Sequence, residues 1–231
     1  MLSIIIPTLN EHDYLGKLLN QLGEFKIQHE VIVIDGGSTD GTLELIKGQS
    51  VKMATADRGR SAQLARGAEL SKGDYLLFLH ADVKLDDQVE HALEMAMCRG
   101  HELGAFKMSF DHSHWFLKLN AWFSRFTHPF FHFGDQGLLI SKSLYRRVGG
   151  FDTRLPIMED QDLYRRAAKF TKAYKMEAEV AVSSRKYLQY GIFRLQLLFY
   201  VLWLNYQIGK DANQLHQRYQ AFLSTKKRDG T

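Results

Sequence analysis

Four polar side chains stand where apolar runs end in the first half of the chain. Asp35 ends the run "VIVID", Asp57 ends "VKMATAD", and His80 and Asp82 end "DYLLFLHAD". Carboxylate oxygens bind hard divalent cations and accept N–H groups of a nucleotide base, while an imidazole binds a hydroxyl or Mn²⁺. A single aspartate after a strand is more typical of a turn or a helix cap, but four such side chains at one edge indicate a ligand site.

The elements that must position these side chains alternate along the chain. Residues 2–8, 29–37, 51–57 and 74–80 are short, mainly apolar runs, which predicts strands. The segments between them have the apolar spacing of helices, namely residues 10–25, 38–48, 59–73 and 86–100. This alternation predicts an α/β fold with a mostly parallel sheet flanked by helices. Ligands of such sheets bind beyond the carboxyl ends of the strands, where all four polar side chains fall.

The second half of the chain is less regular. Residues 103–110 alternate between apolar and polar types, which predicts a strand at an exposed edge of the sheet. The expected elements after it are an aromatic amphipathic helix at 114–126, a strand and short helix at 136–151, a helix at 156–170, a strand and turn at 173–187, and helices at 188–208 and 211–223. No linker or repeat interrupts the chain, so we expect one continuous domain of residues 1–231.

The composition is that of a soluble globular protein, with 45% hydrophobic and 24% charged residues. A net charge of +4 suits an anionic small molecule or a lipid surface, and the lack of a long Lys/Arg block argues against nucleic acid. The one cysteine, Cys98, excludes a disulfide within the chain, favours a reducing, cytoplasmic compartment and is expected to be at least half-buried. The apolar segment 192–208 contains four polar residues, which favours a buried or interfacial helix over a membrane span.

A third acidic group stands at the expected start of a helix. The run "MEDQD" supplies Glu159, Asp160 and Asp162. Acids are common at helix N-termini for electrostatic reasons alone, yet a positioned carboxylate is also what general base catalysis needs. Arg58 and Arg60 lie close to another expected helix start. They are equally consistent with an anion-binding site and with arginines on an exposed surface.

Several motifs resemble those of the inverting glycosyltransferases of family 2, which have the GT-A fold, and they occur in the order found in that family. The motifs are "SIIIPTLNE", "VIVIDGGSTDGT", "ADRGRSAQLARGAELSKGDYLLFLHADVKL", "GDQGLLISKSLYRRVGGFD" and "MEDQDLYRRA". The chain is most similar to the branch called radical-SAM/selenodomain-associated transferase 2, which similarly carries "LHAD" where most relatives carry Asp-x-Asp. The resemblance spans about Leu2 to Leu204, and its motifs specify the superfamily far better than the substrate.

The resemblance implies a division of labour along the chain. Residues 1–110 would bind the nucleotide, residues 111–187 would form the acceptor side, and residues 188–231 would form C-terminal helices packed alongside. It implies an inverting, metal-assisted transfer from a UDP- or GDP-linked sugar to a small or lipid-linked acceptor, with no nucleic acid involved. Because Tyr187 stands where processive relatives have Trp, a single transfer is expected.

The resemblance also implies roles for single residues. Asp160 would be the general base, and Glu159 would hold a neighbouring arginine or backbone group. Asp82 would be the metal ligand, with His80 beside it replacing an acid, so that the metal would be Mn²⁺ or Mg²⁺. The residues expected on the donor or acceptor are Pro7, Asn10, Glu11, Asp35, Asp57, Arg60, His80, Ala81, Asp135, Gln136 and Arg185.

Two other functions compete with this interpretation. A sugar-1-phosphate nucleotidyltransferase would need a Gly-rich loop with Arg and Lys near the first strand, and "PTLNEHDYLGK" lacks one. A non-catalytic module with the same fold would bind no nucleotide. The aromatic segment 113–133 also has three interpretations, namely a helix packed on the sheet, a lid over an apolar acceptor, or a contact with a membrane surface.

Overall fold

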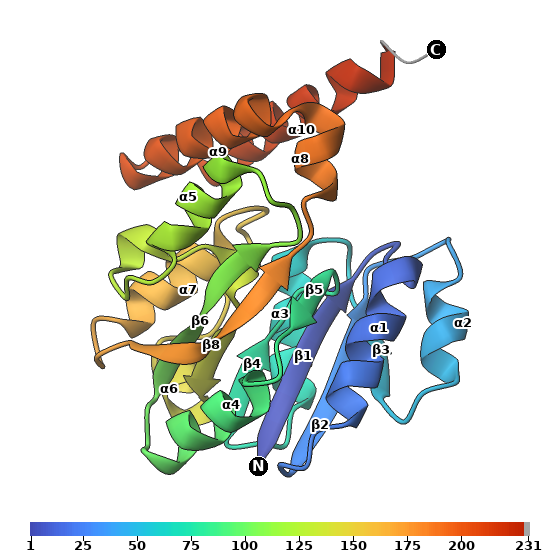
Figure 1. Cartoon of the computed structure of the whole chain (residues 1–231), viewed down its shortest axis with the longest axis vertical. Coiled ribbons are helices and arrows are strands. Elements are labelled where there is room, and N and C mark those ends of the chain that lie inside the picture. Colours follow the sequence, from blue (N-terminus) through green and yellow to red (C-terminus); the bar gives the residue numbers. More distant parts are fainter. Residues whose placement is uncertain (229–231) are drawn as a thin grey trace.

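The computed structural model describes residues 1–228, with side chains up to Ser224; the last three residues of the expected C-terminal part lie outside the described residues. The strands are β1 (Leu2–Thr8), β2 (His29–Asp35), β3 (Lys52–Thr55), β4 (Tyr75–Phe78), β5 (Val83–Leu85), β6 (Leu103–Phe110), β7 (Leu138–Ser141) and β8 (Tyr174–Val182). They form one sheet in the order β3-β2-β1-β4-β7-β6-β8-β5 (Figure 1). The expected α/β fold with a mostly parallel sheet and flanking helices is confirmed, although the sheet is mixed.

Helices cover both faces of this sheet. They are α1 (His12–Gly23), α2 (Thr42–Lys47), α3 (Arg60–Leu70), α4 (Val89–Cys98), α5 (Trp115–Phe123), α6 (Lys142–Arg147), α7 (Glu159–Ala167), α8 (Arg185–Tyr190), α9 (Ile192–Gln207) and α10 (Ala212–Arg228), with short 3₁₀ turns η1 (Pro129–Phe131) and η2 (Gly134–Gln136). The apolar residues of α1 recur at helical spacing and are all buried: Leu15, Leu18, Leu19 and Leu22. Two hydrophobic clusters, one on each face, therefore clamp the central strands.

The parallel strands β3, β2, β1 and β4 form the half that brings the expected site residues to one edge. All seven residues of β1 are buried, as expected for an apolar strand flanked on both sides. On one face α3 lies so close to β1 that a Cβ on Gly67 would be 2.3 Å from the Ile5 side chain. The buried Gln63 of α3 donates to the carbonyl oxygens of Thr8 and Ile34 at 2.8 Å each. These bonds fix the carboxyl ends of β1 and β2 against the start of α3.

Two expectations, one for β6 and one for Cys98, are wrong. The strand β6 does not lie at an edge, since β7 and β8 pair with its two sides and its first four residues are buried. The alternation at Lys107 and Ser109 reflects a half-covered face rather than an unpaired edge. Cys98 is exposed instead of buried or half-buried, because it falls on the outer side of the last turn of α4. The sequence interpretation also missed β5, a three-residue strand that pairs with β8.

The C-terminal helices α8, α9 and α10 gather with α5 beyond the carboxyl end of β1 (Figure 1). The helix α9 contacts both α8 and α10, and α5 contacts β6 of the sheet. The rings of Phe116 in α5 and Phe193 in α9 also touch. Within residues 1–228, none of the helices combines the length and the apolar character needed to cross a bilayer.

Candidate active site

Two residues with left-handed backbone geometry introduce the acids of the site. Asn10 has φ 57° directly before Glu11, and Met158 has φ 65° directly before Glu159 and Asp160. Side chains other than glycine adopt this geometry at a cost, and it concentrates where function requires a particular chain direction. Asn10 is held there because its Oδ1 accepts from the Thr39 amide at 2.8 Å. In both places the strained residue turns the following carboxylates toward the carboxyl edge of the sheet.

Asp35 uses its carboxylate to build the turn after β2. It is buried, and its Oδ2 accepts from the amides of Gly37 and Ser38 at 2.8 and 2.9 Å. The Ser38 hydroxyl donates to the other oxygen, Oδ1. Asp57, by contrast, is exposed after β3. The structure thus places both acids at the expected edge, with Asp35 engaged by its own turn.

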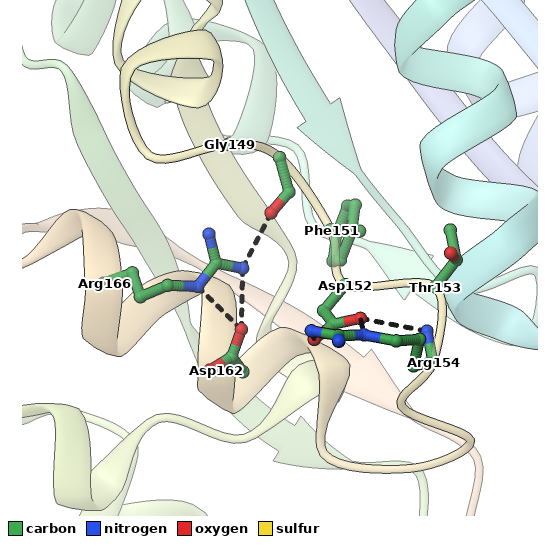
Figure 2. A pocket seen from close by; sticks show the side chains of 8 residues that line it. Gly149, Phe151, Asp152, Thr153, Arg154, Asp162 and Arg166 are labelled. Atoms are coloured by element: carbon green, nitrogen blue, oxygen red, sulfur yellow. Dashed lines mark hydrogen bonds and ion pairs between the residues drawn. The ribbon is translucent and has the colours of Figure 1, made fainter.

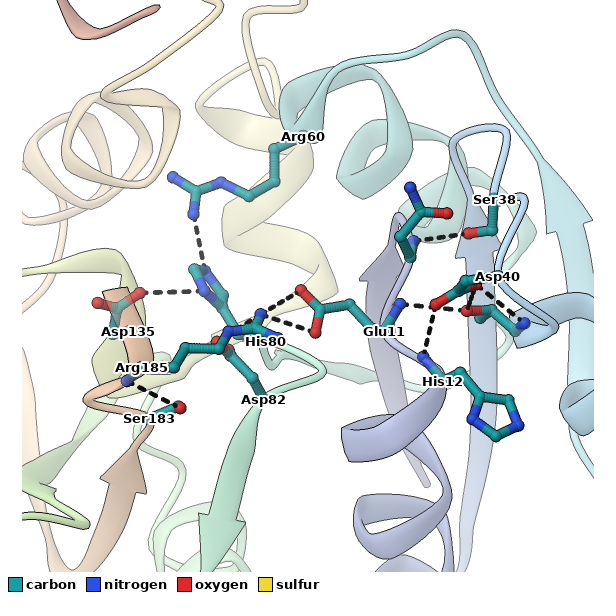
Figure 3. Close-up of polar contacts among 12 residues, drawn as sticks. Glu11, His12, Ser38, Asp40, Arg60, His80, Asp82, Asp135, Ser183 and Arg185 are labelled. Atoms are coloured by element: carbon teal, nitrogen blue, oxygen red, sulfur yellow. Dashed lines mark hydrogen bonds and ion pairs between the residues drawn. The ribbon is translucent and has the colours of Figure 1, made fainter. Parts of the chain in front are cut away.

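A first charged group, the Arg60 cluster, consists of Arg60, His80, Asp135, Glu159 and Asp160. The guanidinium of Arg60 forms an ion pair with Glu159, which is 1% exposed, and its Nη2 lies 3.8 Å from Asp160 Oδ2. His80 Nδ1 lies 3.0 Å from Asp135 Oδ1, and its Nε2 lies 3.3 Å from Arg60 Nη1 (Figure 3). The cluster joins the strand end after β4, the start of α3, η2 and the start of α7 in one place.

Within this cluster, the surroundings of Asp160 raise the pKa of its carboxyl group. Burial, and then the neighbouring Glu159, raise the pKa of Asp160 to about 6, against the opposing effect of Arg60. Its Oδ2 is buried and has no hydrogen-bond partner among the described residues. A buried acceptor without a donor is costly, so this oxygen is poised for a donor from outside the chain. At neutral pH the group is ionised and able to accept a proton.

His80 and Asp135 perturb each other in the opposite sense. Burial and Arg60 oppose a charge on His80, but the hydrogen bond and charge of Asp135 outweigh them and raise the pKa of the imidazole. Despite burial, the hydrogen bond to His80 and the charges of His80 and Arg60 hold the pKa of Asp135 well below its usual range. Asp135 therefore stays a carboxylate and fixes the orientation of the His80 ring.

The loop before β7 is shaped to receive Asp160. A Cβ on Gly134 would lie 2.3 Å from Asp160 Oδ2, so only glycine leaves room for the carboxylate there. Gln136 follows in the same loop but faces the interior: it is fully buried, donates to the Phe131 carbonyl at 2.9 Å and accepts from Lys175 at 2.9 Å. The structure brings Asp135 to the charged cluster and leaves Gln136 behind it.

A network around Arg166 holds the loop that leads into α7. Arg166 pairs with Asp162 at 2.6 Å (Figure 2). It also donates to the carbonyl oxygens of Val148 and Gly150. Asp152 and Arg154 form a second pair in the same hollow, with Nη2 and Oδ2 2.8 Å apart. Arg166 thus ties α7 to the loop at Val148 and Gly150.

A second charged group, the Arg185 cluster, consists of Arg185, Glu11, Asp82 and Tyr14. The Arg185 Nη2 lies 2.6 and 2.7 Å from the two Glu11 oxygens and 3.1 Å from Asp82 Oδ2 (Figure 3). The guanidinium also lies over the Tyr14 ring, 4.4 Å from its centroid, in a cation–π contact. Burial outweighs the charge of Arg185 and raises the pKa of Glu11.

This second cluster tests whether the site suits a divalent cation. Three carboxylate oxygens from Glu11 and Asp82 converge on one guanidinium nitrogen, so the nitrogen marks a point that oxygen ligands already surround. Hard cations such as Mg²⁺ and Mn²⁺ prefer this donor set, which therefore fits the metal. Arg185 holds that point here. Within residues 1–228 no three His, Cys, Asp or Glu side chains form a ready metal cluster, and His80 faces Asp135 rather than Asp82.

The remaining predicted residues lie buried near the same edge. Pro7 is buried within β1 and Ala81 is buried between His80 and Asp82. Sequence reasoning missed two residues that shape the site, Gln63 and Tyr14. The apolar spacing of α1 did include Tyr14, but nothing in that pattern reveals its contact with Arg185. Gln63 is a polar residue on the buried side of a helix, and that signal was available.

The chain matches a known sequence family. The sequence profile described as Glycosyl transferase family 2 matches residues 3–147, more than half of the chain. The chain belongs to this family. It is 39% identical over 101 residues to the 4,4'-diaponeurosporenoate glycosyltransferase of Staphylococcus haemolyticus, a match covering 40% of this chain and 26% of that protein. The first curated relatives are matched over between 26% and 64% of their own length.

Solved structures of the same fold carry nucleotides. Residues 1–349 of S. aureus TarS in complex with UDP superpose with a TM-score of 0.66 at 17% identity, covering 96% of this chain and 70% of that one. The mannosyltransferase PcManGT from Pyrobaculum calidifontis, in complex with GDP-Man and Mn²⁺, gives a TM-score of 0.62 at 19% identity, covering 78% and 56%. At such low identity the likeness shows the fold alone.

Proposed function

We propose that this member of glycosyl transferase family 2 moves a sugar from a UDP- or GDP-linked donor to an acceptor hydroxyl with inversion. The observation that carries the proposal is Asp160, a buried carboxylate with an unpartnered oxygen and a pKa near 6 beside Arg60. Inversion needs one direct attack on the anomeric carbon, and a positioned carboxylate that accepts the proton of the attacking hydroxyl serves as its base. The narrower branch suggested by "LHAD" stays a prediction.

The donor side of the proposal rests on the cations and turns at the carboxyl edge. The diphosphate of the donor is an anion, and Arg60 and Arg185 are the two guanidinium groups placed within the charged clusters. The turn built by Asp35 exposes backbone next to Gly37, where a base or ribose can approach closely. As the diphosphate leaves, these positive groups stabilise the negative charge that develops on it.

The metal side rests on Asp82 and Glu11. Once Arg185 releases them, these carboxylates would hold Mn²⁺ or Mg²⁺. PcManGT was crystallised with Mn²⁺. When bound, such a metal supplies positive charge to the leaving diphosphate. His80 as a ligand stays a prediction, since its imidazole would first have to leave Asp135. Arg185 would leave Glu11 and Asp82 only if it paired with another anion, and the donor diphosphate is such an anion.

The acceptor side of the proposal rests on Tyr187 and Asp135. A small or lipid-linked hydroxyl compound fits the single-transfer interpretation of Tyr187, and Asp135 of the Arg60 cluster could bind it. A nucleotidyltransferase is disfavoured because the turn after β1 holds Asn10 and Glu11 instead of a Gly-rich loop.

Calorimetry tests the proposal. UDP and GDP are titrated into the protein with and without Mn²⁺, and into the Asp82→Asn variant. We expect one nucleotide to bind, more tightly with Mn²⁺, and the Mn²⁺-dependent gain to disappear in Asp82→Asn. A protein that binds neither nucleotide under either condition is a non-catalytic scaffold, and the proposal fails.

A further inference from the structure

An apolar stripe runs along the outer side of α9. Its members recur at helical spacing and are all exposed: Phe193, Leu197, Val201, Leu204 and Ile208. Leu197 is 63% exposed and Leu204 is 53% exposed. A polar side chain at either position would leave the core undisturbed, so packing of the core does not explain these leucines. The inner side of the helix is buried in the ordinary way through Leu195 and Leu202. The helix is therefore apolar both inward and outward.

A second stripe of the same kind lies on α5 and the segment after it. Its exposed members are Trp115, Leu119, Trp122, Phe126 and Phe130. The two stripes lie side by side, because the ring of Phe116 is 4.8 Å from that of Phe193 and the ring of Phe130 is 4.0 Å from that of Trp203. Together they form one surface, the α5–α9 face. An exposed apolar surface of this extent, rich in aromatic residues, marks an interaction site.

The two segments that form this face carry charges of one sign. Residues 112–134 and 180–210 contain no aspartate or glutamate. The same two segments carry five exposed cations, namely Lys118, Arg125, Lys186, Arg194 and Lys210. The chain as a whole has 26 acidic residues, so their absence here is not a matter of composition. The partner of this face must accept apolar side chains and must carry negative charge.

We propose that the α5–α9 face docks onto the surface of an anionic lipid bilayer. Aromatic and aliphatic side chains enter the boundary between headgroups and acyl chains, and Lys and Arg pair with the headgroups around them. A second copy of this chain is a poorer occupant, since a symmetric contact would oppose cations to cations. The two helices lie in the plane of the membrane, and neither crosses it.

The face is continuous with the candidate active site. Arg185 of the Arg185 cluster begins α8, which leads directly into α9, and Asp135 follows the aromatic segment by way of η1. A docked protein would present these residues to groups at the membrane surface. Resting on the proposed function, this placement assigns the acceptor to a class: an amphiphile whose hydroxyl or phosphate head lies at the interface while its apolar part stays in the lipid.

Vesicle binding tests docking without any substrate. The wild-type protein is centrifuged with vesicles of phosphatidylcholine and with vesicles of equal phosphatidylcholine and phosphatidylglycerol. We expect binding to the anionic vesicles that weakens as salt is raised. Two of the three tryptophans, Trp115 and Trp122, lie on the face, so their fluorescence should shift to the blue on binding.

Matched variants decide which surface is responsible. Leu197→Asp with Leu204→Asp places two acids on the face, and Phe170→Asp places one on an equally exposed residue in the turn after α7. Lys118→Gln with Arg125→Gln removes two cations from the face, and Lys72→Gln with Lys84→Gln removes two elsewhere. We expect each face variant to raise the lipid concentration for half-binding by about tenfold or more, and the controls to leave it unchanged. Circular dichroism confirms that all four are folded.

The outcomes separate docking from the proposed function. Wild-type binding to anionic vesicles that only the face variants lose supports the proposal. Absence of vesicle binding, or equal loss in Phe170→Asp, overturns it. So does a wild-type dimer, measured by light scattering, that Leu197→Asp with Leu204→Asp makes monomeric while no vesicles bind. Nucleotide binding by calorimetry is measured on the same samples, and its failure would reject the proposed function without affecting the docking result.

Discussion

The Arg60 cluster and the Arg185 cluster each place two carboxylates on one guanidinium, but the two arrangements differ in their surroundings. Glu159 and Asp160 are buried, and Arg60 meets them beside a histidine fixed by Asp135. Arg185 instead lies on the Tyr14 ring at the start of a six-residue helix, and its acids are about a fifth exposed. The first arrangement encloses the proposed base, Asp160. In the second, Arg185 occupies the position between Glu11 and Asp82 where the proposed metal would bind, here called the cation point.

Replacing the base should have the largest effect. We expect Asp160→Asn to lower turnover of the donor by about 10² to 10⁴-fold, because the amide cannot accept the proton. Donor affinity should change little, since Asp160 belongs to the Arg60 cluster and not to the cation point. Turnover is followed as release of the nucleoside diphosphate, and affinity by calorimetry. Asp87→Asn, at an exposed position outside both clusters, is the control, and full activity of Asp160→Asn would remove the base assignment.

Stability should separate the two clusters next. We expect Glu159→Gln to lower the free energy of unfolding by about 1–3 kcal/mol, because it leaves part of the Arg60 charge uncompensated beside a buried site. Glu11→Gln should cost less than about 1 kcal/mol, because its pair with Arg185 is partly exposed. Urea unfolding measures both. Equal losses in the two variants would mean that the clusters are equally rigid.

Metal affinity should respond to Arg185 in the absence of donor. Removing a positive group from the point between Glu11 and Asp82 should tighten Mn²⁺ binding by about tenfold in Arg185→Gln. Arg60→Gln should leave that affinity unchanged, because Arg60 faces the other cluster. Electron paramagnetic resonance of free Mn²⁺ gives both values. Weaker Mn²⁺ binding in Arg185→Gln would show that Arg185 does not cover the cation point.

The smallest effect is a shift of the pH profile. Asp160 must be ionised to act as a base, so activity should rise with pH through about 6 and fall as the carboxylate is protonated below it. Arg60 lowers the pKa of Asp160, so Arg60→Gln should move the midpoint to higher pH. Arg185→Gln should leave the midpoint in place. A shift of equal size in both variants would mean that the clusters are electrostatically one.

The sequence predicted the parallel half well because its elements are local patterns. Apolar runs gave β1, β2 and β4, and their ends placed Asp35, His80 and Asp82 at one edge. The pairings that define the clusters are not local: Arg60 and Glu159 are 99 residues apart, and Arg185 and Glu11 are 174 apart. Which acid meets which arginine depends on how β8 and α7 join the sheet, and no spacing in the chain reports that.

The second half shows the same limit in its strands. The alternation of β6 predicted an edge, but whether a half-polar strand is paired on both sides depends on β7 and β8, which come later in the chain. Likewise, the aromatic segment was visible as residues 113–133, yet its union with α9 into one face required ring contacts such as that of Phe116 with Phe193. Periodicity identifies a stripe and does not identify its neighbour.

The most direct test of the account is the pH dependence of donor turnover in the wild type and in Asp160→Asn, using a sugar nucleotide found by a thermal-shift screen with Mn²⁺. The account predicts that nucleoside diphosphate release by the wild type falls away below about pH 6, and that the small residual rate of Asp160→Asn lacks this acid limb. An unchanged acid limb in Asp160→Asn would show that another group accepts the proton, and would contradict the central claim.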